Sequence, residues 1–332
     1  MRRPAPSPNI VGRAGAVAAW AGVTAWGLWA ALRYAGGDRL PGLGAPSSQL
    51  LAFTPYAAAA APLPVLVALV LRRWWAALAA TVVAAALALA VLPRAVGGGD
   101  PAARGPVVRV LTANLLLGRA DPARIVDLVR RSGVDVLSLQ ELTPEARDRL
   151  DRAGLTRLLP HAAVDARPGG SGTGLYARHP LRALQSPSGM STATPQAEVA
   201  LPGGRRATVT AVHPVPPLTA AAFRQWRHDL AELPAAAAAA RSGGTDAVRI
   251  LAGDFNATLD HASLRRLIER GYADAADRVG AGLVPTWGLG SSRPPLAIDH
   301  VLVDRRCAVR RVAVHDLPGS DHRAVYAEIR LP

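Results

Sequence analysis

Polar side chains stand at six places where apolar runs of this sequence end or are interrupted. In chain order, these segments are LTANLLLG with Asn114, LSLQEL with Gln140 and Glu141, VHPVP with His213, LAGDFNAT with Asp254 and Asn256, AIDHVLV with Asp299 and His300, and GSDHRAV with Ser320, Asp321 and His322. One carboxylate or histidine beside a strand is usually a solvated strand end or a helix cap. Six such places indicate one shared site, because ligand sites in layered α/β folds gather where strand ends meet.

The side chains at these places are mostly carboxylates, amides and imidazoles. Oxygen ligands of this kind suit Mg²⁺ or Mn²⁺, and imidazoles transfer protons or stabilise anions. The sequence has a single cysteine, Cys307, which excludes a disulfide framework and a cysteine-based zinc site. The pattern therefore predicts a divalent-metal site with acid–base groups beside it.

Short β-branched runs separated by helical segments would position these side chains. Strands are expected at 107–113, 134–139, 174–177, 197–201, 207–212, 248–252, 298–303, 309–314 and 324–329, and helices at 122–131, 220–240 and 261–270. Many strands with few helices favour a layered α/β sandwich over an alternating barrel. The length of this region suffices for a sizeable core.

The ordered set N, QE, H, GDFN, DH and SDH resembles the endonuclease/exonuclease/phosphatase superfamily over residues 107–332. The resemblance implies an α/β fold, a four-layer sandwich of two mixed β-sheets flanked by helices. It also implies cleavage of phosphate esters with a divalent metal, Mg²⁺ or Mn²⁺. The metal set that it implies is Asn114, Glu141 and Asp321, and the catalytic set is His213, Asp254, Asn256, Asp299 and His322.

The resemblance also implies roles for the residues that surround the phosphate. Glu141 matches the main metal-binding carboxylate, and Asn114 matches the strand-end amide beside it. Asp254 matches the group that orients or deprotonates the attacking water. Asn256 matches a group that contacts the phosphate, and His213 a histidine that binds phosphate or assists the leaving group.

The last two motifs of the resemblance supply a histidine and its partners. Asp299 would hydrogen-bond and orient His322, while Asp321 would lie at the metal. A His322 paired with Asp299 keeps its tautomer and stays protonated more readily, which would stabilise a pentavalent transition state. Leu116 occupies a position where some family members have an Asp, so a metal set that relies on that acid is incomplete here.

Other residues near these motifs have structural interpretations that we favour over functional ones. Tyr176 and Arg178, in GTGLYARHPL, either face the site or belong to the strand structure, and the structural role of the tyrosine is favoured. Trp287 in PTWG is expected to be buried in the core near the site. His300 should face away from the site, because adjacent strand residues point to opposite sides. His161, His179, His228, His261 and His315 are expected to be surface or structural residues.

The net charge of +14 does not by itself indicate nucleic-acid binding. All 38 basic residues are arginines, against 24 acidic residues. Residues 1–105 carry nine arginines and two aspartates, and residues 106–332 carry 29 arginines and 22 acidic residues, so each part has a net charge of +7. The first part is poor in acids and holds the long apolar runs, which indicates a different environment.

Three stretches, 14–32, 50–71 and 74–92, are apolar and long enough to cross a hydrocarbon core of about 30 Å. We therefore expect a membrane anchor of three transmembrane helices in residues 1–93, a linker at 94–106 and the catalytic domain at 107–332. Arginines precede the first stretch and follow the second, which favours a cytoplasmic location for the start of the first stretch and the end of the second. The third stretch would then cross the membrane outward and leave the catalytic domain outside the cell. Arg33 and Arg39 in the first loop count against this orientation. Buried soluble helices and a cleaved signal peptide are alternatives that three successive spans disfavour.

These features together predict a membrane-anchored, divalent-metal-dependent phosphoesterase that uses in-line attack of water. Its expected partners are the lipid bilayer and a phosphate-ester substrate, either DNA, a phospholipid headgroup or a small phosphate ester. One alternative is a catalytically inactive, membrane-tethered binding module of the same fold. Another is a small transporter with an enzymatic tail, which the absence of acidic residues and histidines from the apolar stretches disfavours. The sequence indicates no protein partner.

Overall fold

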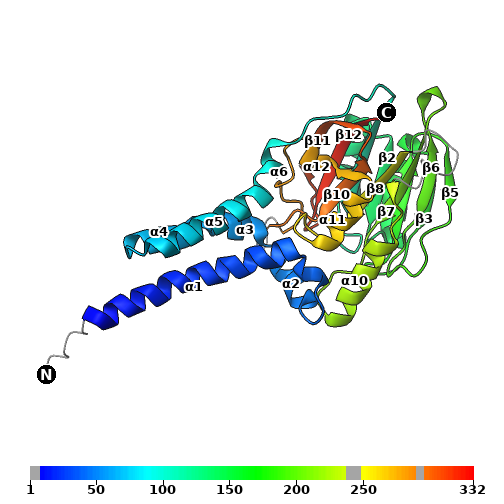
Figure 1. Cartoon of the computed structure of the whole chain (residues 1–332). Helices are drawn as coiled ribbons and strands as arrows, with labels where there is room; N and C mark the ends of the chain where they lie inside the picture. The colour runs from blue at the N-terminus through cyan, green and yellow to red at the C-terminus, as the bar shows by residue number, and fades with distance from the viewer. Residues whose placement is uncertain (1–7, 237–247, 289–294) are drawn as a thin grey trace. The chain divides into compact units, whose positions relative to one another are not determined.

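The computed structural model describes residues 8–236, 248–288 and 295–332 (Figure 1). The chain divides into two compact units, Met1–Pro93 and Arg94–Pro332. Each unit is described by itself below.

The first unit is helical. Its helices are α1 (Pro8–Ala35), η1 (Gly37–Arg39), α2 (Gly44–Leu51), α3 (Thr54–Ala60), α4 (Pro62–Val70) and α5 (Trp74–Val91). Two helical stretches, Arg13–Ala35 and Trp74–Val96, are long and apolar enough to cross a membrane. The expectation of three spans is therefore met only in part, since the middle stretch is a pair of helices, Gly44–Leu51 and Thr54–Val70, bent by 60°.

Prolines stand where the helices α3 and α4 begin. Pro55 and Pro62 stand in the first turns of α3 and α4, where the missing N–H is not needed for an intrahelical hydrogen bond. Farther inside a helix, the same residues would remove a hydrogen bond and clash with the preceding turn. Small side chains pack the helices together, with Ala19, Ala68 and Ala76 among the buried residues.

The second unit contains two six-stranded mixed sheets. Sheet A has the order β11-β12-β1-β2-β4-β3 and sheet B the order β5-β6-β7-β8-β10-β9. Sheet A consists of β1 (Val107–Asn114), β2 (Val136–Gln140), β3 (His161–Asp165), β4 (Thr173–Ala177), β11 (Ala308–Asp316) and β12 (Arg323–Arg330). Sheet B consists of β5 (Leu181–Leu184), β6 (Gln196–Ala200), β7 (Arg206–Val212), β8 (Val248–Asp254), β9 (Tyr272–Asp274) and β10 (Asp299–Asp304). The pairs β1–β2 and β7–β8 are parallel, and the other paired strands are antiparallel.

Alternating side chains of each strand build two separate cores. Val110 of β1 belongs to the core between the sheets, together with Val209 and Ile250 of sheet B. Its neighbour Leu111 belongs to a second core, in which sheet A packs against helices. These helices are α7 (Pro122–Arg131), α8 (Pro144–Ala153) and the short α9 (Leu155–Leu158). One face of sheet A thus packs on sheet B and the other on helices, which agrees with the expected layered α/β sandwich.

Three further helices, α10 (Ala220–Glu232), α11 (Ala262–Glu269) and the short α12 (Ala275–Arg278), lie beside sheet B (Figure 1). The Trp226 indole of α10 donates to the Phe255 carbonyl, just after β8, at 3.0 Å. The same ring packs edge-on against His261, where α11 begins. This packing holds the segment that follows β8.

The expected helix 220–240 is shorter in the structure. It ends at Glu232 because Pro234 follows almost at once, and the residue before a proline avoids helical geometry. Residues 237–240 of that prediction lie outside the described residues. The short strands β3, β5 and β9 were not predicted, since runs of three to five residues carry little periodicity. The ten-residue helix α8 was not predicted either, and its sequence is mostly charged, with only Ala146 and Leu150 buried.

The segment expected as a linker, 94–106, makes specific contacts inside the second unit. Arg94, in the short helix α6 (Pro93–Val96), is buried and binds both oxygens of the Asp260 carboxylate, at 2.7 and 2.6 Å. Asp100 accepts a hydrogen bond from the backbone N–H of Val309. A buried guanidinium needs such a partner, so the beginning of this segment is fixed to the domain.

Candidate active site

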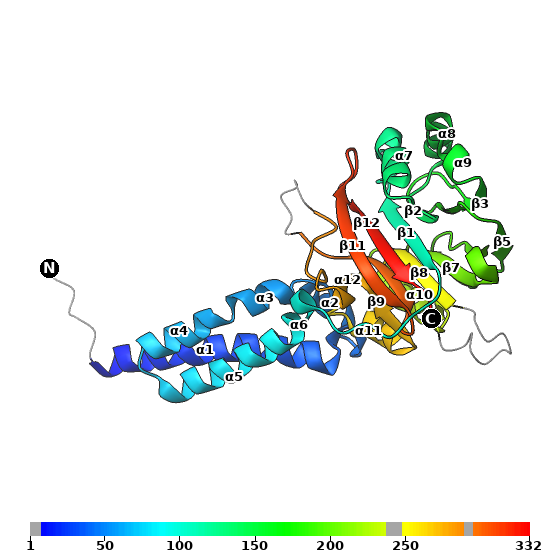
Figure 2. The ribbon, with the colours of Figure 1, turned by 90° about the horizontal axis from the view of Figure 1, so that it is seen from above.

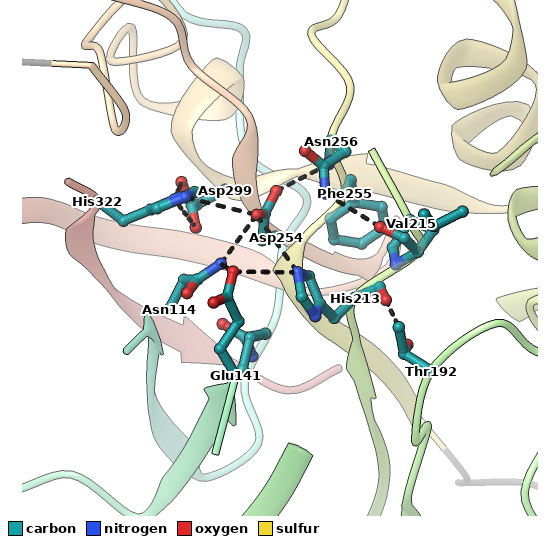
Figure 3. Close-up of polar contacts among 12 residues, drawn as sticks. Asn114, Glu141, Thr192, His213, Val215, Asp254, Phe255, Asn256, Asp299 and His322 are labelled. Carbon is teal, nitrogen blue, oxygen red and sulfur yellow. Dashed lines mark hydrogen bonds and ion pairs between the residues drawn. The ribbon is translucent and has the colours of Figure 1, made fainter. Parts of the chain in front are cut away.

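Strand ends of both sheets converge at one place (Figure 3). Asn114 is the last residue of β1, and Glu141 follows β2, the parallel neighbour of β1. Asp254 is the last residue of β8 and stands directly opposite Asp299, the first residue of β10. His322 immediately precedes β12, which is the antiparallel neighbour of β1. The register therefore brings five of the predicted site residues together from distant parts of the chain.

Asn114 joins carboxylates that come from the two sheets. Its buried side-chain amide donates to Glu141 Oε1 and to Asp254 Oδ2, each at 3.1 Å. Its side-chain oxygen, Oδ1, accepts a hydrogen bond from the Leu116 backbone N–H at 2.9 Å. Asn114 thereby sets the separation of the two carboxylates. Its side-chain oxygen is engaged by a backbone N–H of the same chain.

The loop after β1 has an unusual backbone next to Glu141. Leu116, Leu117 and Glu141 have φ values of 46°, 54° and 54°, in the left-handed region that side chains with a Cβ rarely adopt. The Leu117 backbone N–H donates to Glu141 Oε2 at 2.6 Å. Leu116 stands at the position where the resemblance implied that an acid could occur, and a backbone N–H of the same loop contacts Glu141 instead.

His213 follows β7 and points between the same two carboxylates. Its Nε2 lies 3.8 Å from Glu141 Oε1 and 3.8 Å from Asp254 Oδ2. The ring is buried, and its Nδ1 has no hydrogen-bond partner in the part of the chain that the structure describes. The Thr192 hydroxyl donates to the His213 backbone carbonyl and fixes the backbone at this residue.

Asp254 is almost fully enclosed, with 2% of its surface exposed. Burial and the neighbouring charge of Asp299 raise its pKa, and the histidines His322 and His213 oppose this rise only in part. The Asn256 backbone N–H donates to Asp254 Oδ1 at 2.8 Å. A carboxylate with a raised pKa is a better proton acceptor than one of ordinary acidity.

His322 is held in one orientation by Asp299. Its Nδ1 lies 3.0 and 3.2 Å from the two oxygens of Asp299, and its Nε2 points to Asp254 Oδ2 at 3.7 Å. Burial lowers the pKa of His322, but the charges of Asp299 and Asp254 outweigh burial and raise it to about 10. The imidazole is therefore protonated at neutral pH.

Thr286, which the sequence reasoning missed, positions this pair. Its hydroxyl donates to Asp299 Oδ2 at 2.6 Å and accepts the backbone N–H groups of Ile298 and Asp299 at 3.1 Å. Ser320 has a similar role, since its hydroxyl donates to the Asn114 carbonyl and accepts the His322 N–H. Thr286 is the threonine of the PTWG motif, and this membership was the one available signal for it.

Asp321 also lies near Nε2 of His322, with its Oδ1 3.9 Å from that atom. The Trp287 indole N–H donates to Asp321 Oδ2 at 3.0 Å. The expectation that Trp287 is simply a core residue was wrong, because its ring is only partly buried and binds a predicted site residue. The indole needs a hydrogen-bond acceptor, and a strand-end carboxylate supplies it.

Both the backbone N–H and the side-chain amide of Asn256 make hydrogen bonds within the protein. It has a φ of 47°, and its side-chain amide donates to the Pro214 carbonyl at 3.0 Å. This hydrogen bond joins the loops that follow β8 and β7. Gln140, at the end of β2, hydrogen-bonds Thr112 and Ser138 and is a structural residue.

The remaining histidine and tyrosine of interest lie in the core. His300 contacts Asp274 of β9 at 2.7 Å and the Ala257 carbonyl at 2.8 Å, so it faces away from Asp299 as strand alternation predicts. Tyr176 is buried in the core between sheet A and the helices, and burial raises its pKa. Arg178 donates to the Val134 carbonyl. None of these three needs a catalytic role.

The donor atoms of the site fit a hard divalent cation. Glu141, Asp254 and Asp321 contribute carboxylate oxygens, and the Oδ1 atom of Asp321 is buried with no hydrogen-bond partner among the described residues. Asp254, Asp299 and His322 each offer one ligand atom, and these three atoms lie within 4.8 Å of one another. By distance alone, this set could hold an ion. The raised pKa of His322 argues against that set, because a metal binds only the neutral imidazole.

The sequence matches the endonuclease/exonuclease/phosphatase family over residues 111–322. The chain belongs to this family. The match begins within β1 and ends at His322, so it includes every predicted site residue. Among curated proteins, none matches the chain.

Solved structures share the fold at low sequence identity. An endonuclease/exonuclease/phosphatase protein from Beutenbergia cavernae is 20% identical, with a TM-score of 0.50, over 68% of this chain and 72% of that one. TDP2 from D. rerio, complexed with single strand DNA product, is 16% identical, with a TM-score of 0.51, over 67% of this chain and 98% of that one. An AP endonuclease from Archaeoglobus fulgidus is 12% identical, with a TM-score of 0.52, over 66% and 98%.

Proposed function

We propose that this protein is a membrane-anchored, divalent-metal-dependent phosphoesterase that hydrolyses a phosphodiester or phosphomonoester by in-line attack of water. The observation that carries the proposal is the convergence of Asp254, a carboxylate with a raised pKa, and His322, a protonated imidazole, 3.7 Å apart beside Glu141. A base and a cation side by side are what hydrolysis of an anionic ester requires.

Asp254 is the residue proposed to orient or deprotonate the attacking water. It lies at the centre of the cluster, with Asn114 and the Asn256 backbone fixing its two oxygens. Since both oxygens are held by N–H donors, the carboxylate cannot rotate away from the position where it meets water. A positioned general base of this kind contributes about 10²–10⁴-fold to a rate.

His322 is proposed to stabilise the negative charge that develops on the phosphoryl oxygens. Asp299 holds Nδ1, so the proton on Nε2 is directed into the cluster. Because the imidazole is already protonated, its positive charge is present before the reaction begins. His213, with its Nε2 also directed at the cluster, is proposed to bind the phosphate or assist the leaving group.

A divalent cation, Mg²⁺ or Mn²⁺, is proposed to be held by Glu141 and Asp321, with Asn114 beside them. When bound, such an ion neutralises phosphate charge and polarises its oxygens. Asn114 sets the position of Glu141 through its amide. Asp321 is oriented by Trp287, which leaves its second oxygen for a ligand.

The helical unit is proposed to insert into the cell membrane as a multi-pass anchor, with the catalytic domain outside the cell. Two apolar helices of sufficient length and one bent helix pair support insertion. Many large apolar side chains are exposed on this unit, among them Trp74 and Trp75, which suit a membrane interface. The lipid bilayer and a phosphate ester are therefore the proposed partners.

Three substrate classes stay open: DNA, a phospholipid headgroup and a small phosphate ester. The fold likeness to TDP2 complexed with a DNA product and to an AP endonuclease supports testing DNA first. The alternative of an inactive binding module predicts an eroded site. In this chain, the carboxylates and histidines of the site are present and in mutual contact.

A substrate panel with the purified full chain tests this proposal. Hydrolysis of bis-p-nitrophenyl phosphate, DNA and phospholipid would be measured with Mg²⁺ or Mn²⁺ and again with EDTA. Metal-dependent hydrolysis of any of them that EDTA abolishes is the expected result. If no substrate is cleaved under any metal condition, the binding module is the better description. Protease accessibility of the catalytic domain on intact cells would test its location.

A further inference from the structure

A pocket of about 560 Å³ lies on sheet A, apart from the candidate active site. Its lining includes Arg109, Arg130, Arg131, Arg311, His315 and Glu328. The strands β11, β12 and β1 carry part of this lining and run side by side (Figure 2). The last two residues of α7, Arg130 and Arg131, complete the arginines of the lining.

The pocket and the candidate active site occupy different faces of the same strands. Arg109 has the strand parity of Leu111, which faces the helices, whereas Val108 and Val110 face sheet B. Arg109 also precedes Asn114 by five residues along β1, which is roughly 16 Å at the usual strand rise. The pocket lining contains none of the predicted site residues.

The charge of the lining is strongly positive. Four guanidinium groups face one carboxylate, Glu328, which is already engaged by Arg109 at 3.5 Å and by the Tyr326 hydroxyl at 3.4 Å. Burial and nearby arginines, including Arg311, lower the pKa of His315. The neutral form of this histidine is thus favoured because the surroundings are already cationic.

Two of the arginines form no ion pair among the described residues. Arg131 binds Asp127 at 2.7 Å, outside the pocket lining. For Arg130 and Arg311, no carboxylate contacts the guanidinium within the ranges that the structure describes. Like charges gathered around one concavity repel each other, and a bound anion would relieve this repulsion.

We propose that this pocket binds a phosphate group carried by a small molecule or by a lipid headgroup. Guanidinium groups present paired N–H donors that match phosphate oxygens, and several of them around one pocket suit a multiply charged group. The hydroxyls of Ser132 and Tyr326 in the lining could contact neutral parts of the same ligand. The volume lies within the usual range of small-molecule sites, about 300–1,000 Å³.

Binding of inorganic pyrophosphate to the full chain in neutral detergent, measured by calorimetry in EDTA, tests the proposal. The protein would carry Asp254→Asn, so that the candidate active site cannot turn over its ligands. The test variant adds Arg130→Gln with Arg311→Gln. Its matched control adds Arg152→Gln with Arg157→Gln, two exposed arginines outside the pocket, and therefore has the same net charge.

The expected result is saturable pyrophosphate binding that the pocket variant weakens at least about tenfold, while the control variant retains it. Mixed micelles then distinguish the two sources of phosphate. Displacement of pyrophosphate by phosphatidic acid, and not by phosphatidylcholine, identifies a lipid headgroup, and lack of displacement identifies a soluble phosphate compound. Absence of saturable binding, or equal weakening in both double variants, overturns the proposal.

Discussion

Asp299 of β10 stands directly opposite Asp254 of β8, and the imidazole of His322 contacts both carboxylates, at 3.0 Å through Nδ1 and 3.7 Å through Nε2. Two buried carboxylates at paired strand positions repel each other. The protonation of one group in the cluster therefore changes the pKa values of the others. The cationic imidazole reduces this repulsion. The same arrangement explains why the pKa of Asp254 and that of His322 are both raised.

Replacing the proposed base should remove activity without unfolding the protein. Asp254→Asn keeps the size of the side chain but cannot accept a proton, so kcat should fall about 10²–10⁴-fold. Kinetics on whichever substrate the panel identifies would measure the loss. Asp148→Asn, an exposed change on α8, is the control and should keep full activity. Full activity of Asp254→Asn would contradict the proposed role.

The pH–rate profile should fall in the alkaline range as His322 loses its proton, with a midpoint near its raised pKa of about 10. Asp299→Asn removes a negative charge that raises this pKa, so the alkaline limb should move to lower pH. Asp148→Asn serves again as the control. If the alkaline limb of the Asp299→Asn profile has the same midpoint as that of the unchanged protein, a group other than His322 controls the limb.

The strand-end residues of the site could be predicted from the sequence because each breaks an apolar run. Asn114, Glu141 and Asp254 are local signals of this kind. The β1–β2 pairing brings Asn114 next to Glu141, and the packing of the two sheets brings Asp254 to them. Thr286 could not be found this way. Its function depends on a contact with Asp299, and a threonine in a loop carries no pattern of its own.

The parts of the fold that sequence reasoning missed depend on single residues or on distant partners. Pro234 ends α10 inside an alanine-rich run that otherwise favours helix. The segment 94–106 has the composition of a linker, yet Arg94 binds Asp260, which is 166 positions away. Gly/Pro content describes local flexibility, and it does not reveal such a contact.

His322 should also make the stability of the domain depend on pH. Its folded pKa of about 10 lies above the ordinary value of 6.5, so the stabilisation is fully present below pH 6.5 and is lost as pH rises toward 10. Thermal unfolding across this range should show a falling Tm. In His322→Gln the fall should be smaller, and an unchanged slope would contradict the linkage.

The Thr286 hydroxyl should matter for both activity and stability. Thr286→Val leaves a similar volume but removes the donor to Asp299, which should destabilise the domain by about 1–3 kcal/mol. It should also lower kcat, since the orientation of His322 depends on Asp299. Thr286→Ser keeps the hydroxyl and is the matched control. Equal behaviour of the valine and serine variants would exclude the positioning role.

The buried pair of Arg94 and Asp260 should fix the beginning of the second unit. Arg94→Met leaves the fully buried Asp260 carboxylate without its guanidinium, which costs about 3–5 kcal/mol and lowers Tm by roughly 10 °C. Adding Asp260→Leu removes the charge that Arg94 balances, so the double variant should recover much of the loss. Thermal unfolding of the full chain measures both. If the two single variants and the double variant lose stability additively, the two residues are not energetically coupled, and the segment is held by other contacts.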